Sequence, residues 1–210
     1  DIFRGSNNVS DESLIAWRWT VGAQWTSQNT LQSDLMPEGF DENGDCWGGW
    51  GGPSVDLMEA FGVKPTDAPN DRIDVDIRRK ATIMMPGDVY PYFWRDHSLG
   101  NGQSGFEILH FYFDKNYNPA ATETFQGPCG AQNVKHAYGN NNDHVAELGI
   151  APARMAYAVA THILRLADVY LVLSEAQTLI DGGQTTNAKA LETFNAVRGR
   201  AISGYTPKTS

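Results

Sequence analysis

The sequence predicts a mainly α-helical fold with long loops and a few short strands. Near the carboxyl end, two apolar stretches with helical periodicity are separated by the break DGGQTTN at residues 181–187, which indicates a helical hairpin. Before residue 157, Gly, Pro and Asn are frequent and apolar runs are short. We therefore expect one structural domain with two regions, a loop-rich region over residues 1–156 and the hairpin over residues 157–210.

Three short elements are expected in the loop-rich region. Residues 13–19, SLIAWRW, and residues 105–113, GFEILHFYF, have the aromatic and branched composition of strands. Ser54 can cap a short helix over residues 55–61, which Gly62 would end. Because indoles are usually well buried, we expect core positions for the three Trp residues in or near the first strand, Trp17, Trp19 and Trp25.

The first helix of the hairpin is expected from residue 155 to residue 180. Apolar side chains cover most of its circumference, so other elements should enclose it. Gly182 and Gly183 would end it, and Asn187 or a preceding Thr would cap a second helix over residues 187–202. We expect the two helices to pack through Ile163, Leu166, Tyr170, Phe194 and Val197.

Composition excludes several classes of function. The net charge of −9 argues against nucleic-acid binding, which needs a local excess of Lys and Arg. The chain has neither a run of about 18 apolar residues nor a basic amphipathic helix. Cys46 and Cys129 match no metal spacing, and spacing alone leaves open whether they pair.

Recognisable catalytic and cofactor motifs are also missing. The five His residues show no HExxH spacing, and no Gly-x-Ser-x-Gly sequence is present. GNGQSG at residues 100–105 fits Gly-x-Gly-x-x-Gly, but it precedes an expected strand instead of joining a strand to a helix. We expect no catalytic residue and no cofactor.

The hairpin carries two motifs. The first helix contains RLADVYLVLSEA at residues 165–176, and the second contains NAVRGRA at residues 195–201. They resemble the Arg-Tyr-Ala-(Glu/Asp)-Val-Leu-Leu-x-x-(Ser/Ala)-Glu-Ala and Asn-x-Val-Arg-x-Arg-Ala motifs of the SusD/RagB family, with Leu166 in place of the usual aromatic residue. Upstream, GPSVDLMEAF at residues 52–61 and the segment over residues 71–83 resemble further family segments in the expected order.

The SusD/RagB family comprises surface nutrient-binding lipoproteins of Gram-negative glycan-uptake systems. The resemblance implies a tetratricopeptide-type scaffold that carries a loop-rich ligand-binding region. It also implies non-enzymatic binding of an oligosaccharide or polysaccharide at the outer-membrane surface and its delivery to a TonB-dependent, SusC-like transporter. Family members are longer and carry a lipid anchor that is absent here, so we expect this chain to be a carboxy-terminal part whose hairpin packs on missing helical repeats.

Three alternatives stay open. A member of the same family could bind a peptide or another non-glycan nutrient through backbone hydrogen bonds. Loop carboxylates are abundant enough to supply the acid and the nucleophile of a glycoside hydrolase. The hairpin could also belong to a helical-repeat module that only binds a partner protein.

The loop DENGDCWGGWGG at residues 41–52 is the strongest candidate for a ligand surface. Trp47 and Trp50 offer flat rings on which the C–H faces of sugars stack, and Asn43 and Asp45 offer hydrogen-bonding groups for hydroxyls. Nearby glycines leave few side chains to bury two indoles. The alternative is that both rings fold back under the loop as core residues.

A second aromatic cluster, YPYFW at residues 90–94, contains Tyr92 and Trp94. It either extends the ligand surface or packs under a Pro-containing loop. Residues 41–45 also resemble the opening of a calcium loop, but Cys46 and Gly52 stand where an EF-hand has Gly and Glu. An irregular calcium site in this loop stays an alternative.

Overall fold

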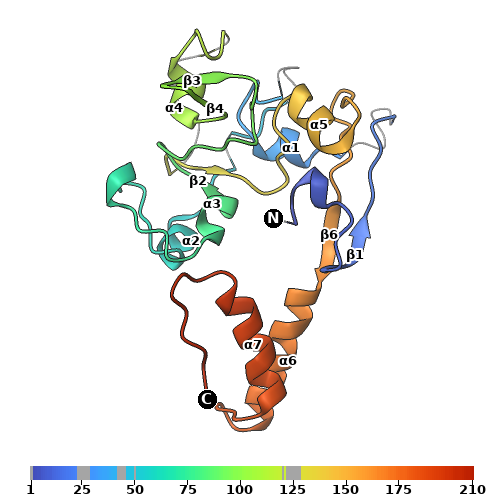
Figure 1. The fold of residues 1–210 in the computed structure, drawn as a ribbon, viewed down its shortest axis with the longest axis vertical. Helices are drawn as coiled ribbons and strands as arrows, with labels where there is room; N and C mark the ends of the chain where they lie inside the picture. The colour runs from blue at the N-terminus through green and yellow to red at the C-terminus, as the bar shows by residue number, and fades with distance from the viewer. Residues whose placement is uncertain (1, 23–28, 42–45, 50, 120, 122–128) are drawn as a thin grey trace.

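The fold, known from a computed structural model, is described for residues 2–22, 29–41, 46–49, 51–119, 121 and 129–210. Figure 1 shows a loop-rich body from which a helical hairpin projects, with the two parts joined through a ribbon of two strands. Most of the regular structure in the described residues is helical, as predicted.

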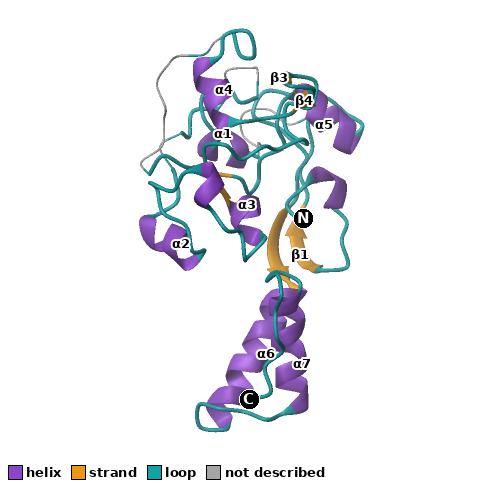
Figure 2. Cartoon of the chain, turned by 60° about the vertical axis from the view of Figure 1, so that its left-hand side comes forward, coloured by secondary structure: helices purple, strands orange, loops and turns teal. Residues whose placement is uncertain are grey.

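The helices are short in the body and long in the hairpin. The body contains two 3₁₀ turns, Gly5–Asn7 and Pro69–Asp71, and five α-helices: α1 (Leu31–Leu35), α2 (Val55–Ala60), α3 (Arg78–Thr82), α4 (Ile108–Phe113) and α5 (Asn141–Leu148). The hairpin consists of α6 (Leu166–Ile180) and α7 (Ala188–Gly199). Figure 2 shows how far this hairpin extends from the body.

The strands form antiparallel pairs. Among the described residues, β1 (Ser13–Trp17) pairs with β6 (Thr161–Arg165), β2 (Ile83–Met84) with β5 (Gln132–Asn133), and β3 (Ser98–Gly100) with β4 (Gln103–Ser104). The first pair fastens the beginning of the chain to the strand that leads into the hairpin. The predicted strand over residues 13–19 is thus confirmed for its first five residues.

Local capping signals are confirmed. The Ser54 side chain accepts a hydrogen bond of 3.2 Å from the Leu57 backbone amide at the start of α2, and Gly62 follows the helix with a φ of +76°. Asn187 caps α7 by accepting hydrogen bonds from the amides of Lys189 and Ala190. These signals act within one turn of chain, which is why they can be read from sequence.

The predicted strand over residues 105–113 is wrong, because residues 108–113 form α4. The Glu107 carboxylate caps this helix by accepting hydrogen bonds from the amides of Leu109 and His110. Its buried side chains, Ile108, Phe111 and Tyr112, have the spacing of one helical face. The aromatic composition favoured a strand, but the spacing of the buried residues and the Glu107 cap are those of a helix.

The predicted start of the first long helix is also wrong. Residues 161–165 form β6, and the helix begins only at Leu166. Pairing with β1 holds residues 161–165 extended, and the Asp168 carboxylate then accepts a hydrogen bond of 3.1 Å from the Arg165 amide at the helix start. The apolar pattern of the sequence continues from the strand into the helix, so the pattern could not show where the helix begins.

The hairpin packs through smaller side chains than predicted. Ser174 donates to the Ala190 carbonyl at 2.9 Å and lies 2.8 Å from the Thr193 hydroxyl, and these residues are buried together with Ala167 and Val197. Phe194 is only partly buried, and Ile163 is an exposed residue of β6 rather than a helical contact. Leu166, Tyr170 and Val197 do lie at the α6–α7 contact, where they line a common cavity.

We expect Phe194→Ala to lower the free energy of unfolding by about 1–2 kcal/mol, because only part of the ring leaves water on folding. A fully buried Phe would cost about 3–5 kcal/mol. Urea denaturation of the variant measures the difference. Leu179→Ala is the matched control, because Leu179 is largely exposed and its loss should change stability little. A loss above 3 kcal/mol for Phe194→Ala would contradict the observed packing.

The expected enclosure of α6 is not met by the described residues. α7 covers one side of α6, while Val172, Leu179 and Ile180 stand exposed on others. An apolar face of this kind is uncommon on a protein surface. The tetratricopeptide-type scaffold that would cover it stays a prediction.

An aromatic cluster forms the core of the body. Buried aromatic side chains from the segment before residue 41, from residues 90–94 and from α4 pack edge to face around Phe40, whose ring centroid lies 4.9 Å from that of Phe106. Cys46 belongs to this cluster, whereas Cys129 packs against a separate cluster that contains Met58. The two cysteines are therefore not joined by a disulfide.

Candidate functional site

Residues 46–49, a described part of the loop over residues 41–52 that contains Trp47, are held against α1 by backbone hydrogen bonds. The Trp47 amide donates to the Ser33 carbonyl at 2.9 Å, and the Gly48 amide donates to the Met36 carbonyl at 3.0 Å. A Cβ atom on Gly48 would lie 1.6 Å from the Asp34 carbonyl oxygen. This glycine is therefore required because two backbones touch, a reason distinct from the lack of neighbours inferred from sequence.

Trp47 presents its indole at the surface. Its Nε1 donates to Asp34 Oδ1 at 3.2 Å, and Asp34 Oδ2 accepts a hydrogen bond of 2.7 Å from the Thr30 hydroxyl. The side chain is 47 % exposed, so the ring is fixed at its nitrogen and open to solvent elsewhere. Its role in ligand binding stays a prediction.

The other candidate ligand residues of this loop lie outside the described residues. Asn43, Asp45 and Trp50 fall there, and so does most of the acidic segment considered for calcium. Asp41, the described acidic residue at its start, is buried rather than presented to a ligand. Among the residues that the structure describes, no group of three or more His, Cys, Asp or Glu side chains is arranged to hold a metal ion.

Trp94 lies in the core rather than at a surface. It is 2 % exposed, its Nε1 donates to the Phe40 carbonyl at 2.7 Å, and its ring stacks on Tyr117 at a centroid distance of 5.4 Å. A ring enclosed in this way offers no face to a ligand. Of the two possibilities considered for residues 90–94, packing in the core is the one that holds for Trp94.

Tyr92 is half-buried beneath the Arg4 guanidinium, which lies 4.3 Å from its ring centroid. Burial raises the pKa of Tyr92 and lowers the pKa of Arg4 to about 10. Arg4 also forms an ion pair with Glu147, which in turn contacts Arg95. The cation covers one face of Tyr92, so this ring is a poorer stacking platform than Trp47.

A polar cluster lies just after this segment. The Asp96 carboxylate accepts hydrogen bonds from the side-chain amides of Asn140, at 2.9 Å, and Asn142. Partial burial raises the pKa of Asp96, but the hydrogen bonds from both amides and from His97 outweigh it and lower the pKa to about 2. Asp96 therefore stays ionised at neutral pH and ties the loop to α5, unlike the general acid of a glycosidase, whose pKa is raised.

The expected burial of Trp17 and Trp19 is wrong. Trp17 is 61 % exposed and Trp19 is partly exposed, and both belong to the side of the β1–β6 ribbon that faces solvent. The aromatic and branched composition of residues 13–19 predicted the strand correctly but gave no information on which face of it the body covers. The available signal was the i, i+2 spacing, which places both indoles on one face of a strand. Trp25 lies outside the described residues.

A partly open cavity lies where the hairpin meets the body. It measures about 90 Å³, lies between α6 and α7, and is bordered by the Glu12–Arg200 ion pair. Pockets that enclose small molecules usually measure about 300–1,000 Å³. This cavity is too small for an oligosaccharide.

The sequence matches the SusD family over residues 11–209. The chain belongs to the SusD family. A SusD-like protein of Bacteroides ovatus (strain ATCC 8483) is 29 % identical over 202 residues, which cover 96 % of this chain and 30 % of that protein. The chain thus spans about a third of the length of this SusD relative.

Two solved structures share the SusD fold over the whole chain at 26 % identity. One, determined with a xylogluco-oligosaccharide, superposes with a TM-score of 0.67 and is covered over 34 % of its length. The other superposes with a TM-score of 0.68 and is covered over 33 %. Among the described residues of this SusD chain, no helix combines the length and the apolar character needed to cross a membrane.

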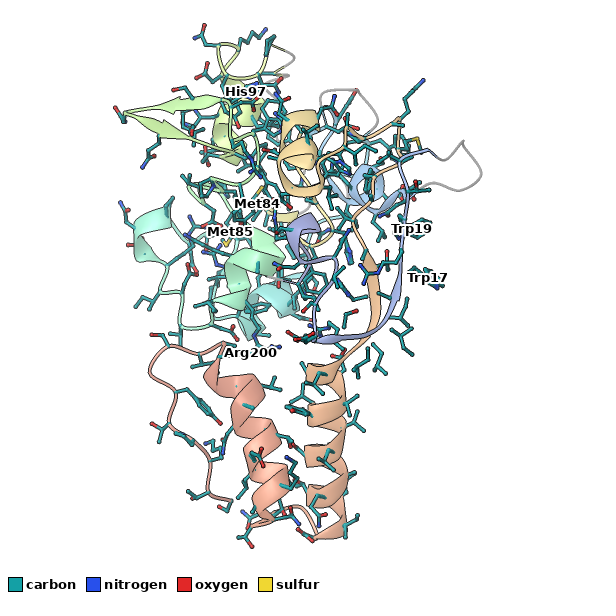
Figure 3. All side chains as sticks on the ribbon, turned by 45° about the vertical axis from the view of Figure 1, so that its right-hand side comes forward. Trp17, Trp19, Met84, Met85, His97 and Arg200 are labelled. Atoms are coloured by element: carbon teal, nitrogen blue, oxygen red, sulfur yellow. The ribbon has the colours of Figure 1, made fainter. Side chains whose placement is uncertain are left out.

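The SusD motif residues make structural contacts in this chain. Arg200 pairs with Glu12 through two hydrogen bonds of 2.9 Å, which fasten the end of α7 to the segment before β1. Figure 3 shows Arg200 at the end of the hairpin that lies next to the body. The Asn195 side chain binds both the amide and the carbonyl of Lys208, at 2.8 and 2.9 Å, and thereby holds the last residues along α7. These contacts give the carboxyl-terminal motifs a structural role.

Proposed function

We propose that this chain supplies part of a non-enzymatic oligosaccharide-binding surface. The observation that carries the proposal is the relative determined with a xylogluco-oligosaccharide, onto which the whole chain superposes. The exposed, nitrogen-anchored indole of Trp47 supports it, because a flat ring open to solvent is suited to stacking on a pyranose. The binding energy would come from stacking and hydrogen bonds, with no bond cleaved.

The cellular part of the proposal rests on family membership. SusD-family proteins serve glycan uptake at the outer-membrane surface, so we infer that the whole protein is a lipid-anchored surface protein there. It would hand its oligosaccharide to a TonB-dependent transporter. Co-purification of the whole protein with such a transporter from outer membranes would test this step, and its recovery without any transporter would contradict it.

We expect Trp47→Ala to weaken oligosaccharide binding by about 1–3 kcal/mol, or about 5- to 150-fold in Kd, if stacking on bases is a guide to stacking on sugars. Isothermal titration with a panel that includes xylogluco-oligosaccharide measures the change. Trp47→Phe keeps a ring and should retain most of the affinity. Both variants should keep a denaturation midpoint close to wild type, because about half of the Trp47 side chain is exposed to solvent.

The same panel separates the alternatives. An unchanged Kd for Trp47→Ala would place the site elsewhere on the protein. Binding of peptides in place of sugars would favour a non-glycan nutrient binder. Release of shorter sugars during a long incubation would identify a glycoside hydrolase and overturn the non-enzymatic proposal.

A further inference from the structure

The β1–β6 ribbon has an inner face and an outer face with different surroundings. On the inner face, His162 lies 2.9 Å from the Ile2 carbonyl oxygen, and its ring meets that of Phe3 at a centroid distance of 6.2 Å. The beginning of the chain thus covers this face. On the outer face, Trp17 is paired in register with Thr161, and the pairing then skips Ile163, which is an exposed residue.

The two indoles of the outer face are held in a defined arrangement. Trp19 Nε1 donates to the Thr161 hydroxyl at 2.9 Å, so the Trp19 ring is fixed across the ribbon. The rings of Trp17 and Trp19 lie 6.3 Å apart between centroids and at 89° to each other. Together they form a right-angled corner, and Figure 3 shows both side chains standing out from the ribbon into solvent.

The outer face carries no charge among these side chains. Trp17, Trp19 and Thr161 supply rings, a methyl group and one hydroxyl, while Arg18 is an exposed residue just beyond the end of β1. Such a surface complements a neutral ligand that has flat apolar faces and a rim of hydroxyls. A protein partner engages about 20–30 residues on each side, which is far more than this narrow ribbon presents.

We propose that the outer face of the β1–β6 ribbon is a stacking site for a neutral oligosaccharide. One pyranose would lie on the open face of Trp17, with Trp19 as a wall beside it and the Thr161 hydroxyl at its rim. The proposal rests on the proposed function, but it assigns binding to residues other than Trp47. Since Trp17 lies in β1 and the Trp19 indole is hydrogen-bonded to Thr161, the site is preorganised and binding would order few side chains.

The test measures the Kd of the full chain for two ligands, xylogluco-oligosaccharide and an oligosaccharide of uronic acids. Four variants are compared with wild type: Trp17→Ala, Trp17→Phe, Thr161→Val and Trp47→Ala. We expect Trp17→Ala to weaken binding of the neutral sugar at least about 10-fold, as loss of one stacked ring does. Trp17→Phe should lose less. Thr161→Val frees the Trp19 ring and should have an intermediate effect. Because Trp17 is mostly exposed, all variants should keep the wild-type circular dichroism spectrum.

Several outcomes would overturn the site. Wild-type affinity in Trp17→Ala with a loss in Trp47→Ala would remove the ribbon from the binding surface and leave the proposed function standing. Tighter binding of the uronic-acid sugar would contradict the neutral class. If sedimentation shows that Trp17→Ala dissociates oligomers while sugar affinity is unchanged, the face is an interface between copies. If wild type binds neither sugar, the site and the proposed function both fall.

Discussion

Asp88→Ala should lower the free energy of unfolding by about 3–5 kcal/mol, because it leaves a buried cation without its closest partner. Arg79 is 1 % exposed and its guanidinium pairs with both Asp88 and Asp74. Asp88 also accepts a hydrogen bond of 2.9 Å from the Met85 amide and lies 3.7 Å from Arg72. One carboxylate therefore contacts two cations and satisfies one backbone amide.

The ionisation of these groups supports the same expectation. Burial lowers the pKa of Arg79, but its hydrogen bonds to Asp74 and Asp88 outweigh this and raise it above the usual value. The hydrogen bond from Arg79 lowers the pKa of Asp74. Because an arginine guanidinium keeps its proton in proteins, Arg79 stays charged when Asp88 is removed, and its desolvation is then poorly compensated.

Urea denaturation of two control variants makes the test specific. Asp74→Ala should cost clearly less than Asp88→Ala, because the Asp74 side chain is 29 % exposed and water can replace it. Adding Arg79→Met to Asp88→Ala should recover part of the loss, since the unpaired cation is then gone. Equal losses for the two Asp variants, or no recovery in the double variant, would contradict the buried network.

The second large effect is expected at Trp94. Trp94→Ala should lower the free energy of unfolding by about 3–5 kcal/mol, since it opens a cavity among Phe111, Phe40 and Tyr117. It also leaves the Phe40 carbonyl without the hydrogen bond from the indole nitrogen. Denaturation by urea, followed by circular dichroism, measures the loss.

Trp47→Ala is the matched comparison, because it removes the same side chain from an exposed position. Its stability should stay within about 0.5 kcal/mol of wild type, as is usual for a surface substitution. For Trp94→Ala, sugar affinity measured on the folded protein should change little. A stable Trp94→Ala protein with weakened binding would show that Trp94 contacts ligand, and the structure of this segment would then be wrong.

Local signals in the sequence determined the hairpin and its caps. Ser54, Gly62 and Asn187 act on the nearest turn of chain, so their effects do not depend on distant residues. The motifs at residues 165–176 and 195–201 carried the family resemblance, which is confirmed by the match over residues 11–209. The exposed indole of Trp47 was also accessible from sequence, because the loop around it offers few side chains.

Burial and strand pairing were decided only by the tertiary structure. Residues 161–165 are extended because β1 lies beside them, and nothing in their own apolar pattern distinguishes them from the helix that follows. Trp17 and Trp94 both lie in short stretches rich in aromatic and apolar residues, yet Trp17 is exposed and Trp94 is enclosed. Which face of an element is covered depends on segments far away in the chain, such as residues 2–3 over the inner face of the ribbon. The sequence by itself therefore determined the family, the hairpin and the caps, while only packing between distant segments decided which aromatic rings are open to a ligand.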